Sequence, residues 1–200
     1  MADKIKILFD SFHLYHLPQF DPVIDLLSRD DRFQIFHSTA AVNKKEEREL
    51  CLNILATKPG TMIYSESEEE RAKMMKELDL DFFVCGWSRY ELDEYISEKT
   101  LAGMIYHGIG VKPSYWRDNH PRLNIRFVEG IYRMDQLRSH GVDKELVLTG
   151  FTKLDPLFSQ NPGFDEKLAQ SLGLDPSKKT ILFAPTFYPS SLERFGMKLG

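Results

Sequence analysis

The chain has 200 residues, of which 42% are hydrophobic and 12% aromatic, a composition that supports a packed core and excludes an intrinsically disordered protein. Its 26 basic and 30 acidic residues give a net charge of −4, so no overall positive field would hold nucleic acid. No apolar run approaches the roughly 20 residues that span a bilayer, and the first residues lack a signal-peptide pattern.

The cysteines and histidines give no pattern of a metal site. Cys51 and Cys85 have no paired spacing, so we expect neither a disulfide framework nor a zinc site. His13 and His16 are three residues apart, but no third ligand type follows at a recognisable spacing. The first loop is not glycine-rich and there is no P-loop. We therefore expect no metal and no cofactor, and a reduced, cytoplasmic setting.

Apolar runs alternate with helical patterns in the first half of the chain. The predicted strands are residues 5–9, 33–37, 62–64, 82–85 and 101–106. Helices are predicted to begin at Asp21, with Pro22 in the first helical position, and at Asn43. Ser67 and Glu70 form a capping-box pattern that predicts a further helix. Leu50, Ile54 and Leu55 are expected on the inner face of the second helix.

The second half continues the alternation. Strands are predicted at 125–128 and 146–148, and helices at 133–140, from 155 and at 164–172. Residues 180–186 read as a buried strand followed by a loop. We therefore expect an α/β fold, with a mostly parallel Rossmann-like sheet and helices on both faces. Residues 1–178 would form an N-terminal domain with its linker, and residues 179–200 would start a second, truncated domain.

Polar and aromatic residues recur where the predicted strands end. His13, His37 and His107 each lie at or just beyond such an end, as do residues 87–89. In parallel sheets with helices on both faces, ligands bind outside the carboxyl ends of the strands. The sequence therefore predicts a site at this edge of the sheet.

The stretch from Gly103 to Lys112 combines an apolar run, a histidine, two glycines and a lysine. We interpret it as a buried strand that delivers His107 to a cleft, where Gly108 and Gly110 allow a turn or a close approach to a ligand. The alternative is an ordinary strand-end histidine and a glycine turn.

The segment from His107 to His140 is locally basic, with a net charge of +3 from six basic and three acidic residues. Most of these side chains are expected to face solvent. The basic residues are Lys112, Arg117, Arg122, Arg126, Arg133 and Arg138. A histidine can take a proton from an attacking hydroxyl near neutral pH, and lysine or arginine can neutralise a phosphate leaving group. These residues together indicate an edge of the sheet that handles phosphates.

Residues 127–155 resemble the CDP-glycerol glycerophosphotransferases, a family of teichoic-acid-type polymerases and primases. The family typically has a Gly-x-Pro-Arg-x-Asp motif after a strand, a helix and a second strand. Gly150 and Asp155 match this motif, while Thr152 and Lys153 stand where the family has proline and arginine.

Three further segments carry the same resemblance, in the family's order. His107, Gly108 and Lys112 match a His-Gly-x-x-x-Lys motif, with Tyr106 in the place of a usual tryptophan. Residues 17–23 look like an early Leu-Pro-x-Phe-x-Pro-Val segment, and residues 182–186 are similar to a Tyr-Ala-Pro-Thr strand that opens the second domain.

The resemblance implies the N-terminal, acceptor-side half of a GT-B transferase. His107 would act as the base on the acceptor hydroxyl, and the donor would be a nucleotide-activated unit such as CDP-glycerol. The acceptor would be a polyol phosphate, a glycan or a lipid-linked molecule of the cell envelope, with peripheral contact at the inner face of the membrane as an option. The second domain would hold the nucleotide, so this piece alone would be inactive. Residues that would contact substrate are His13, Gly108, Lys112, Gly150, Lys153, Asp155 and Thr186.

Departures from the family pattern at Gly110, Thr152 and Lys153 keep other functions open. The chain could belong to a sugar-nucleotide glycosyltransferase or resemble the UDP-N-acetylglucosamine 2-epimerases, which have a similar architecture. A non-catalytic module that binds nucleotides or glycans is the third interpretation.

Overall fold

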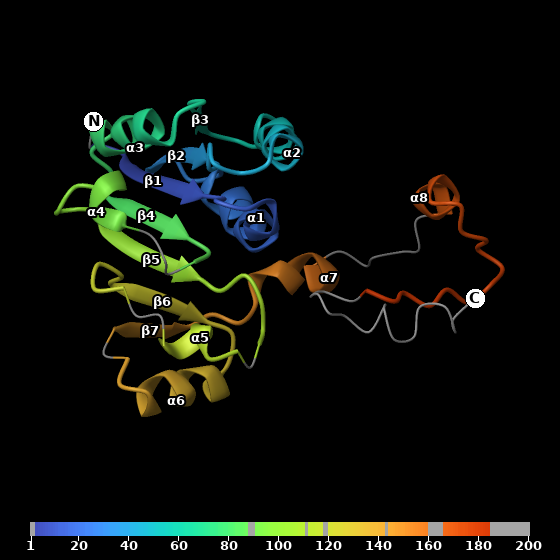
Figure 1. Cartoon of the computed structure of the whole chain (residues 1–200). Coiled ribbons are helices and arrows are strands. Elements are labelled where there is room, and N and C mark those ends of the chain that lie inside the picture. The colour runs from blue at the N-terminus through green and yellow to red at the C-terminus, as the bar shows by residue number, and fades with distance from the viewer. Residues whose placement is uncertain are drawn as a thin grey trace. The chain divides into compact units, whose positions relative to one another are not determined.

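A computed structural model describes residues 3–87, 91–110, 112–117, 120–142, 144–159 and 166–184 (Figure 1). The chain divides into two compact units, residues 1–160 and 161–200. The first unit contains the sheet, and the described part of the second contains helix α8 (Glu166–Ser171). The domain boundary that the sequence places between residues 178 and 179 stays a prediction.

Seven parallel strands form one sheet in the order β3-β2-β1-β4-β5-β6-β7 (Figure 1). Their bounds are β1 Ile5–Asp10, β2 Phe33–Ser38, β3 Thr61–Ile63, β4 Phe82–Cys85, β5 Leu101–Ile105, β6 Ile125–Val128 and β7 Glu145–Leu148. The chain builds outward from β1 to β3 and then crosses back to place β4 on the other side of β1. The strand order therefore reverses between β1 and β4, the point at which sheets of this kind open a ligand crevice.

Helices and short helical turns connect the strands of the first unit. They are η1 Leu14–His16, α1 Leu17–Leu27, α2 Lys45–Leu55, α3 Glu68–Glu77, α4 Leu92–Tyr95, α5 Ser114–Arg117, α6 Ile131–Ser139, η2 Thr152–Leu154 and α7 Asp155–Ser159. Helices α4 and α5 are not predicted from the sequence, because a helix of four residues is too short to show a helical period.

The two faces of the sheet carry separate cores, because successive strand residues point to opposite faces. Leu8 packs on one face with Met75 of α3, Leu92 of α4 and Leu137 of α6. Ile7 packs on the other face with residues of α1. The parallel sheet with helices on both faces is therefore confirmed.

Some predicted helix details are confirmed and others are wrong. The Ser67 hydroxyl accepts a hydrogen bond from the Glu70 amide and caps α3, as predicted. Helix α1 begins four residues before Asp21, because Pro18 takes one of its first two positions and Pro22 lies inside it. In α2, Leu50 is 50% exposed whereas its neighbour Cys51 is buried, so the inner face is rotated by one residue.

The strand expected over residues 180–186 is absent from its described part, residues 180–184. Ile181 and Leu182 are 92% and 87% exposed. An apolar run becomes a strand only when a neighbouring strand accepts its backbone hydrogen bonds, and these residues have no such neighbour in the part of the chain described.

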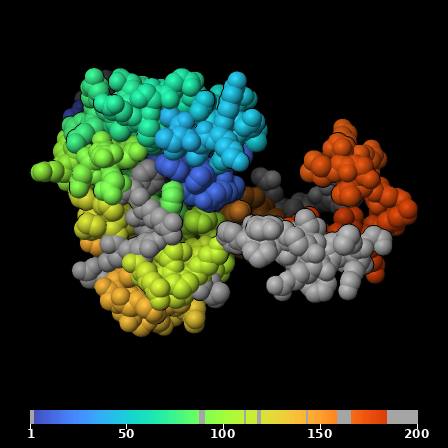
Figure 2. All heavy atoms as spheres, viewed as in Figure 1, coloured from blue at the N-terminus to red at the C-terminus, as the bar shows by residue number. Residues whose placement is uncertain are grey.

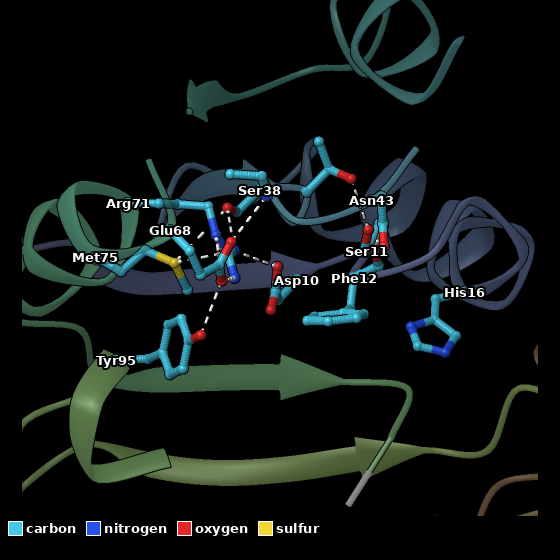
Figure 3. Close-up of polar contacts among 12 residues, drawn as sticks. Asp10, Ser11, Phe12, His16, Ser38, Asn43, Glu68, Arg71, Met75 and Tyr95 are labelled. Carbon is cyan, nitrogen blue, oxygen red and sulfur yellow. Dashed lines mark hydrogen bonds and ion pairs between the residues drawn. The ribbon is translucent and has the colours of Figure 1, made fainter. Parts of the chain in front are cut away.

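A buried ion network joins the carboxyl ends of β1 and β2 to α3 (Figure 3). The Arg71 guanidinium donates hydrogen bonds to Asp10 Oδ1 at 2.9 Å and to Ser38 Oγ at 2.8 Å. It also pairs with Glu68, which accepts a 2.8 Å hydrogen bond from the Tyr95 hydroxyl. The side chains of Arg71 and Asp10 are both 0% exposed, so the two charges need compensation inside the protein, and this network contributes it. No sequence pattern predicts this network, because Asp10, Ser38 and Arg71 are far apart along the chain.

Replacement of Arg71 by methionine should lower the free energy of unfolding by about 3–5 kcal/mol, because it removes the guanidinium that forms an ion pair with the buried Asp10 carboxylate. Urea unfolding followed by circular dichroism measures the change. Lys45→Ala is the matched control, since it removes an exposed ion pair with Glu49 and should cost about 0.5 kcal/mol or less. Equal losses in the two variants would contradict the structural role of the network.

Candidate functional site

The candidate site lies at the carboxyl edge of the sheet, around the point where the strand order reverses. The chain leaving β1 carries His13 and His16, the chain leaving β4 carries Trp87, and the chain leaving β5 carries His107. In Figure 2 the blue N-terminal segment and the yellow-green segment beyond residue 100 meet on the face shown. Ring contacts between Tyr15 and His107, with centroids 5.1 Å apart, confirm that these segments are neighbours.

His107 is half-buried and held in one orientation. Its Nδ1 lies 2.9 Å from the carbonyl oxygen of Gly86. A carbonyl oxygen only accepts, so Nδ1 carries the proton and donates it to Gly86. Nε2 has no hydrogen-bond partner among the described residues. The ring therefore presents an unprotonated Nε2, the arrangement that a general base requires.

The surroundings of His107 favour the neutral imidazole. Burial lowers its pKa below the ordinary value of 6.5, although the hydrogen bond to Gly86 opposes this. The positive charges of Lys112, Lys153 and His13 lower the pKa further. Because the pKa lies below neutrality, Nε2 keeps its lone pair at physiological pH.

His16 is fully buried beside His107. Its ring centroid lies 5.2 Å from that of His107 and 4.7 Å from that of Tyr15. Burial, followed by the charges of His107 and His13, lowers the pKa of His16 to about 2. Its Nδ1 accepts a long hydrogen bond of 3.5 Å from the His13 amide, so Nε2 carries the proton, and that buried atom has no partner among the described residues.

Gly86 makes this arrangement possible. A Cβ at this position would lie 2.8 Å from Cγ of His16, so no larger residue fits without moving the ring. The same residue supplies the carbonyl that orients His107. Gly86 therefore sets the position of both imidazoles.

Gly108 and Gly110 approach an aromatic ring. A Cβ at Gly108 would lie 3.0 Å from the Tyr115 hydroxyl, and one at Gly110 would lie 2.8 Å from Cε2 of the same ring. The Arg133 guanidinium lies 4.9 Å from the ring centre of Tyr115 and donates a hydrogen bond to the Gly110 carbonyl. The two glycines thus allow the segment after His107 to pack on Tyr115.

The expectation of mostly solvated basic residues is wrong for Arg126 and Arg133, which are 0% and 3% exposed. Arg126 donates a 2.7 Å hydrogen bond to the Tyr106 hydroxyl, and Arg133 pairs with Glu129 at 2.9 Å. Buried cations of this kind need such partners, and here they brace the segment that carries the glycines. Lys112 is exposed.

The turn η2 brings Lys153 to the same region. The Thr152 hydroxyl donates a 2.6 Å hydrogen bond to the Gln19 carbonyl, which fastens η2 to α1. The charge of Lys153 then acts on the pKa of His107. His13 and Lys153, which are far from His107 in the sequence, therefore act on the same imidazole as Lys112, and Gly108 follows His107 directly.

Other predicted site residues lie elsewhere or outside the described residues. Gly150 is exposed with a left-handed φ of +80°, which turns the chain, and Asp155 is exposed at the start of α7. Nε2 of His37 contacts the Pro59 carbonyl at 2.5 Å instead of the histidine cluster. Thr186, Ser88 and Arg89 lie outside the described residues.

Sequence reasoning missed the aromatic and polar groups that frame the histidines. The sequence pattern points to His16 only as a possible metal ligand, and it does not single out Tyr15 or Tyr115. Only the three-residue spacing of His13 and His16 hinted at their proximity. Among the described residues no group of three histidine, cysteine or acidic side chains could hold a metal ion.

Comparison with known families identifies a match in the second half of the chain. Residues 126–197 match the sequence model of the CDP-Glycerol:Poly(glycerophosphate) glycerophosphotransferase family. The family resemblance is confirmed for this segment. It includes Gly150 and Asp155, which match the glycerophosphotransferase motif, and Lys153, which stands in place of its arginine; it begins after His107. No curated protein sequence matches the chain.

Solved structures with a similar fold include UDP-N-acetylglucosamine 2-epimerases. The enzyme from Neisseria meningitidis bound to UDP-GlcNAc matches 98% of this chain and 60% of its own, with a TM-score of 0.60 and 12% identity. The S. aureus MnaA–UDP structure matches 86% of this chain and 52% of its own, with a TM-score of 0.54 and 11% identity. At these identities the matches establish the fold alone, which is GT-B-like, and the chain spans little more than half the length of these structures.

No helix among the described residues combines the length and the apolar character that crossing a bilayer requires.

The stability of the fold should fall in acid because of His16. Its pKa is about 2 in the folded protein and 6.5 in the unfolded chain, so below pH 6.5 only the unfolded chain takes up the proton. Lowering the pH from 7.5 to 5.0 should therefore remove about 2 kcal/mol of unfolding free energy through this residue. Urea unfolding at the two pH values measures the loss.

His16→Phe keeps a ring in the same space and cannot take up a proton, so this variant should lose about 2 kcal/mol less over the same interval. His140→Gln, a change at an exposed histidine, should behave like the wild type. A His16→Phe variant with the full wild-type acid sensitivity would show that His16 is not buried as a neutral ring.

Proposed function

We propose that this chain is the acceptor-side half of a GT-B transferase that moves a glycerophosphate unit from a nucleotide-activated donor such as CDP-glycerol. The acceptor is a hydroxyl of a cell-envelope polymer or of a lipid-linked molecule. His107 serves as the general base. The single observation that carries the proposal is the free Nε2 of His107, with Nδ1 fixed on the Gly86 carbonyl and two lysine charges acting on the ring.

The chemistry follows from this arrangement. His107 Nε2 takes the proton of the acceptor hydroxyl as its oxygen bonds to the phosphorus of the donor. The bond from that phosphorus to the nucleotide phosphate breaks, and CMP leaves when CDP-glycerol is the donor. Lys112 and Lys153 supply positive charge on the side from which the phosphates approach. The groups that hold the nucleotide would come from a second domain.

The family match supports a glycerophosphate donor, because residues 126–197 fit the model of enzymes that transfer this unit. The nucleotide part of the donor is supported by the fold, since a similar structure was solved with UDP-GlcNAc bound. A cell-envelope acceptor, and work at the inner face of the membrane, follow from the family resemblance and are part of the proposal.

His107→Ala should reduce the release of CMP from CDP-glycerol at least about a hundredfold, because the acceptor hydroxyl loses its base. The assay uses the product of the complete gene, with the 200-residue chain alone expected to be inactive. His140→Ala is the control, since it removes an exposed histidine at the end of α6. Retained turnover in His107→Ala, with its fold intact by circular dichroism, would exclude His107 as the base.

Lys112→Ala should raise the KM for the phosphorylated donor about tenfold while kcat changes less, because the lysine contributes a charge to donor binding. Steady-state kinetics of CMP release separate the two constants. Lys178→Ala removes an exposed lysine whose ion-pair partner is Asp175 and is the matched control. An unchanged KM in Lys112→Ala would remove the lysine from the donor site.

A second candidate function is epimerisation or transfer of a nucleotide sugar, favoured by the fold shared with UDP-N-acetylglucosamine 2-epimerases. NMR of UDP-GlcNAc incubated with the product of the complete gene distinguishes the two. Appearance of the C2 epimer or of free UDP, without turnover of CDP-glycerol, would replace the first proposal with this one. A protein that binds either nucleotide and turns over neither would be a binding module.

A further inference from the structure

Glu47, in the first turn of α2, holds the segment after β1 through a single carboxylate oxygen. Its Oε1 lies 3.2 Å from Nδ1 of His13 and 3.1 Å from the backbone nitrogen of Leu14. The His13 and Glu47 side chains are 26% and 31% exposed, so the pair is only partly open to solvent. The proton transfer assigned to His107 does not pass through this pair.

The carboxylate determines which nitrogen of His13 carries the proton. An ionised carboxylate only accepts hydrogen bonds, so Nδ1 of His13 must be the donor. Nε2 has no hydrogen-bond partner among the described residues. Carboxylates that fix the tautomer and the orientation of a histidine in this way recur at catalytic and metal sites.

His13 and His107 belong to the same cluster. The ring of Tyr15 stacks on His13 with centroids 5.0 Å apart and an interplanar angle of 14°. The same ring lies 5.1 Å from that of His107, and His16 contacts both histidines. Two imidazoles thus flank one tyrosine, each anchored through Nδ1 to a protein oxygen and each with an open Nε2.

The two anchors differ in charge, and this difference separates the two roles. The anchor of His107 is a neutral carbonyl. It orients the ring but does not compensate the positive charge that the ring would carry when protonated. The anchor of His13 is a carboxylate, which can compensate the positive charge of an imidazolium. A cationic imidazole with a free Nε2–H is suited to a phosphate oxygen.

We propose that Glu47 is the positioning residue of a second functional imidazole, in which His13 donates its Nε2 proton in a hydrogen bond to a phosphate oxygen of the donor. This inference rests on the proposed function, because it places the phosphate at the edge of the sheet where His107 acts. Glu47 does not touch the substrate and acts through His13.

The first test reads the tautomer of His13 in the 200-residue chain labelled with ¹⁵N-histidine. At about pH 8, long-range ¹H–¹⁵N spectra should show the His13 proton on Nδ1. Glu47→Ala should move it to Nε2. Glu47→Gln should leave it on Nδ1, because the amide oxygen can still accept it. Glu46→Ala removes an exposed carboxylate from the same turn and should change nothing.

The second test titrates the same labelled proteins with inorganic phosphate at about pH 6. Phosphate should shift the ring signals of His13, and the apparent Kd should rise about tenfold in Glu47→Ala and stay unchanged in Glu46→Ala. Glu47→Gln should bind phosphate with intermediate affinity, since it keeps the orientation and loses the charge. The double variant His13→Ala, Glu47→Ala should bind no more weakly than His13→Ala alone.

The outcomes separate this inference from the proposed function. Glu47→Ala spectra with the proton still on Nδ1, or an unchanged phosphate Kd, would overturn the role of Glu47 and leave His107 as the base. If Glu47→Ala does not fold, the phosphate titration is done with Glu47→Gln. An unchanged Kd in that variant would overturn the role of Glu47 in the same way. Turnover retained in His107→Ala would overturn the proposed function, whatever the His13 spectra show.

Discussion

The site depends on the contact between Gly86 and two histidines. The carbonyl of Gly86 accepts the Nδ1 proton of His107, and the absence of a side chain at Gly86 leaves room for the ring of His16. Hydrogen bonding fixes one imidazole and close packing fixes the other. Because Gly86 follows β4 directly, the position of both rings is tied to the centre of the sheet, where the strand order reverses.

Buried charges at the carboxyl edge stabilise the segments that carry the site. Arg71 joins the ends of β1 and β2 to α3, and Arg133 joins the segment after His107 to α6 through Tyr115. Burying a guanidinium is costly unless every charge and hydrogen bond is compensated, so these networks favour one arrangement of the loops. A base must be held in one geometry before substrate arrives, and contacts of this kind favour a single geometry.

Much of the fold could be predicted from the sequence because its strands are short apolar runs in regular alternation with helices. The position of His107 just beyond the end of a strand could also be predicted, since an apolar run, the histidine and two glycines follow one another in the sequence. The residues around His107 could not be predicted. Gly86, His16 and Lys153 are distant from it in the sequence, and the order of the strands in the sheet brings them close. The buried position of Arg133 could not be predicted either, because charge alone does not reveal a buried partner such as Glu129. For residues 180–184 the sequence predicts a strand that the structure lacks, because an apolar run forms a strand only beside a neighbouring strand.

The most direct test is the dependence of kcat/KM on pH for CMP release from CDP-glycerol. This profile reports the pKa of the essential base in the free enzyme. The neutral His107 described here predicts that activity falls in acid with a midpoint below the ordinary histidine value of 6.5, because burial and nearby lysines lower its pKa. A midpoint above 7, or the same acid midpoint in an active His107 variant, would contradict the assignment of His107 as the base.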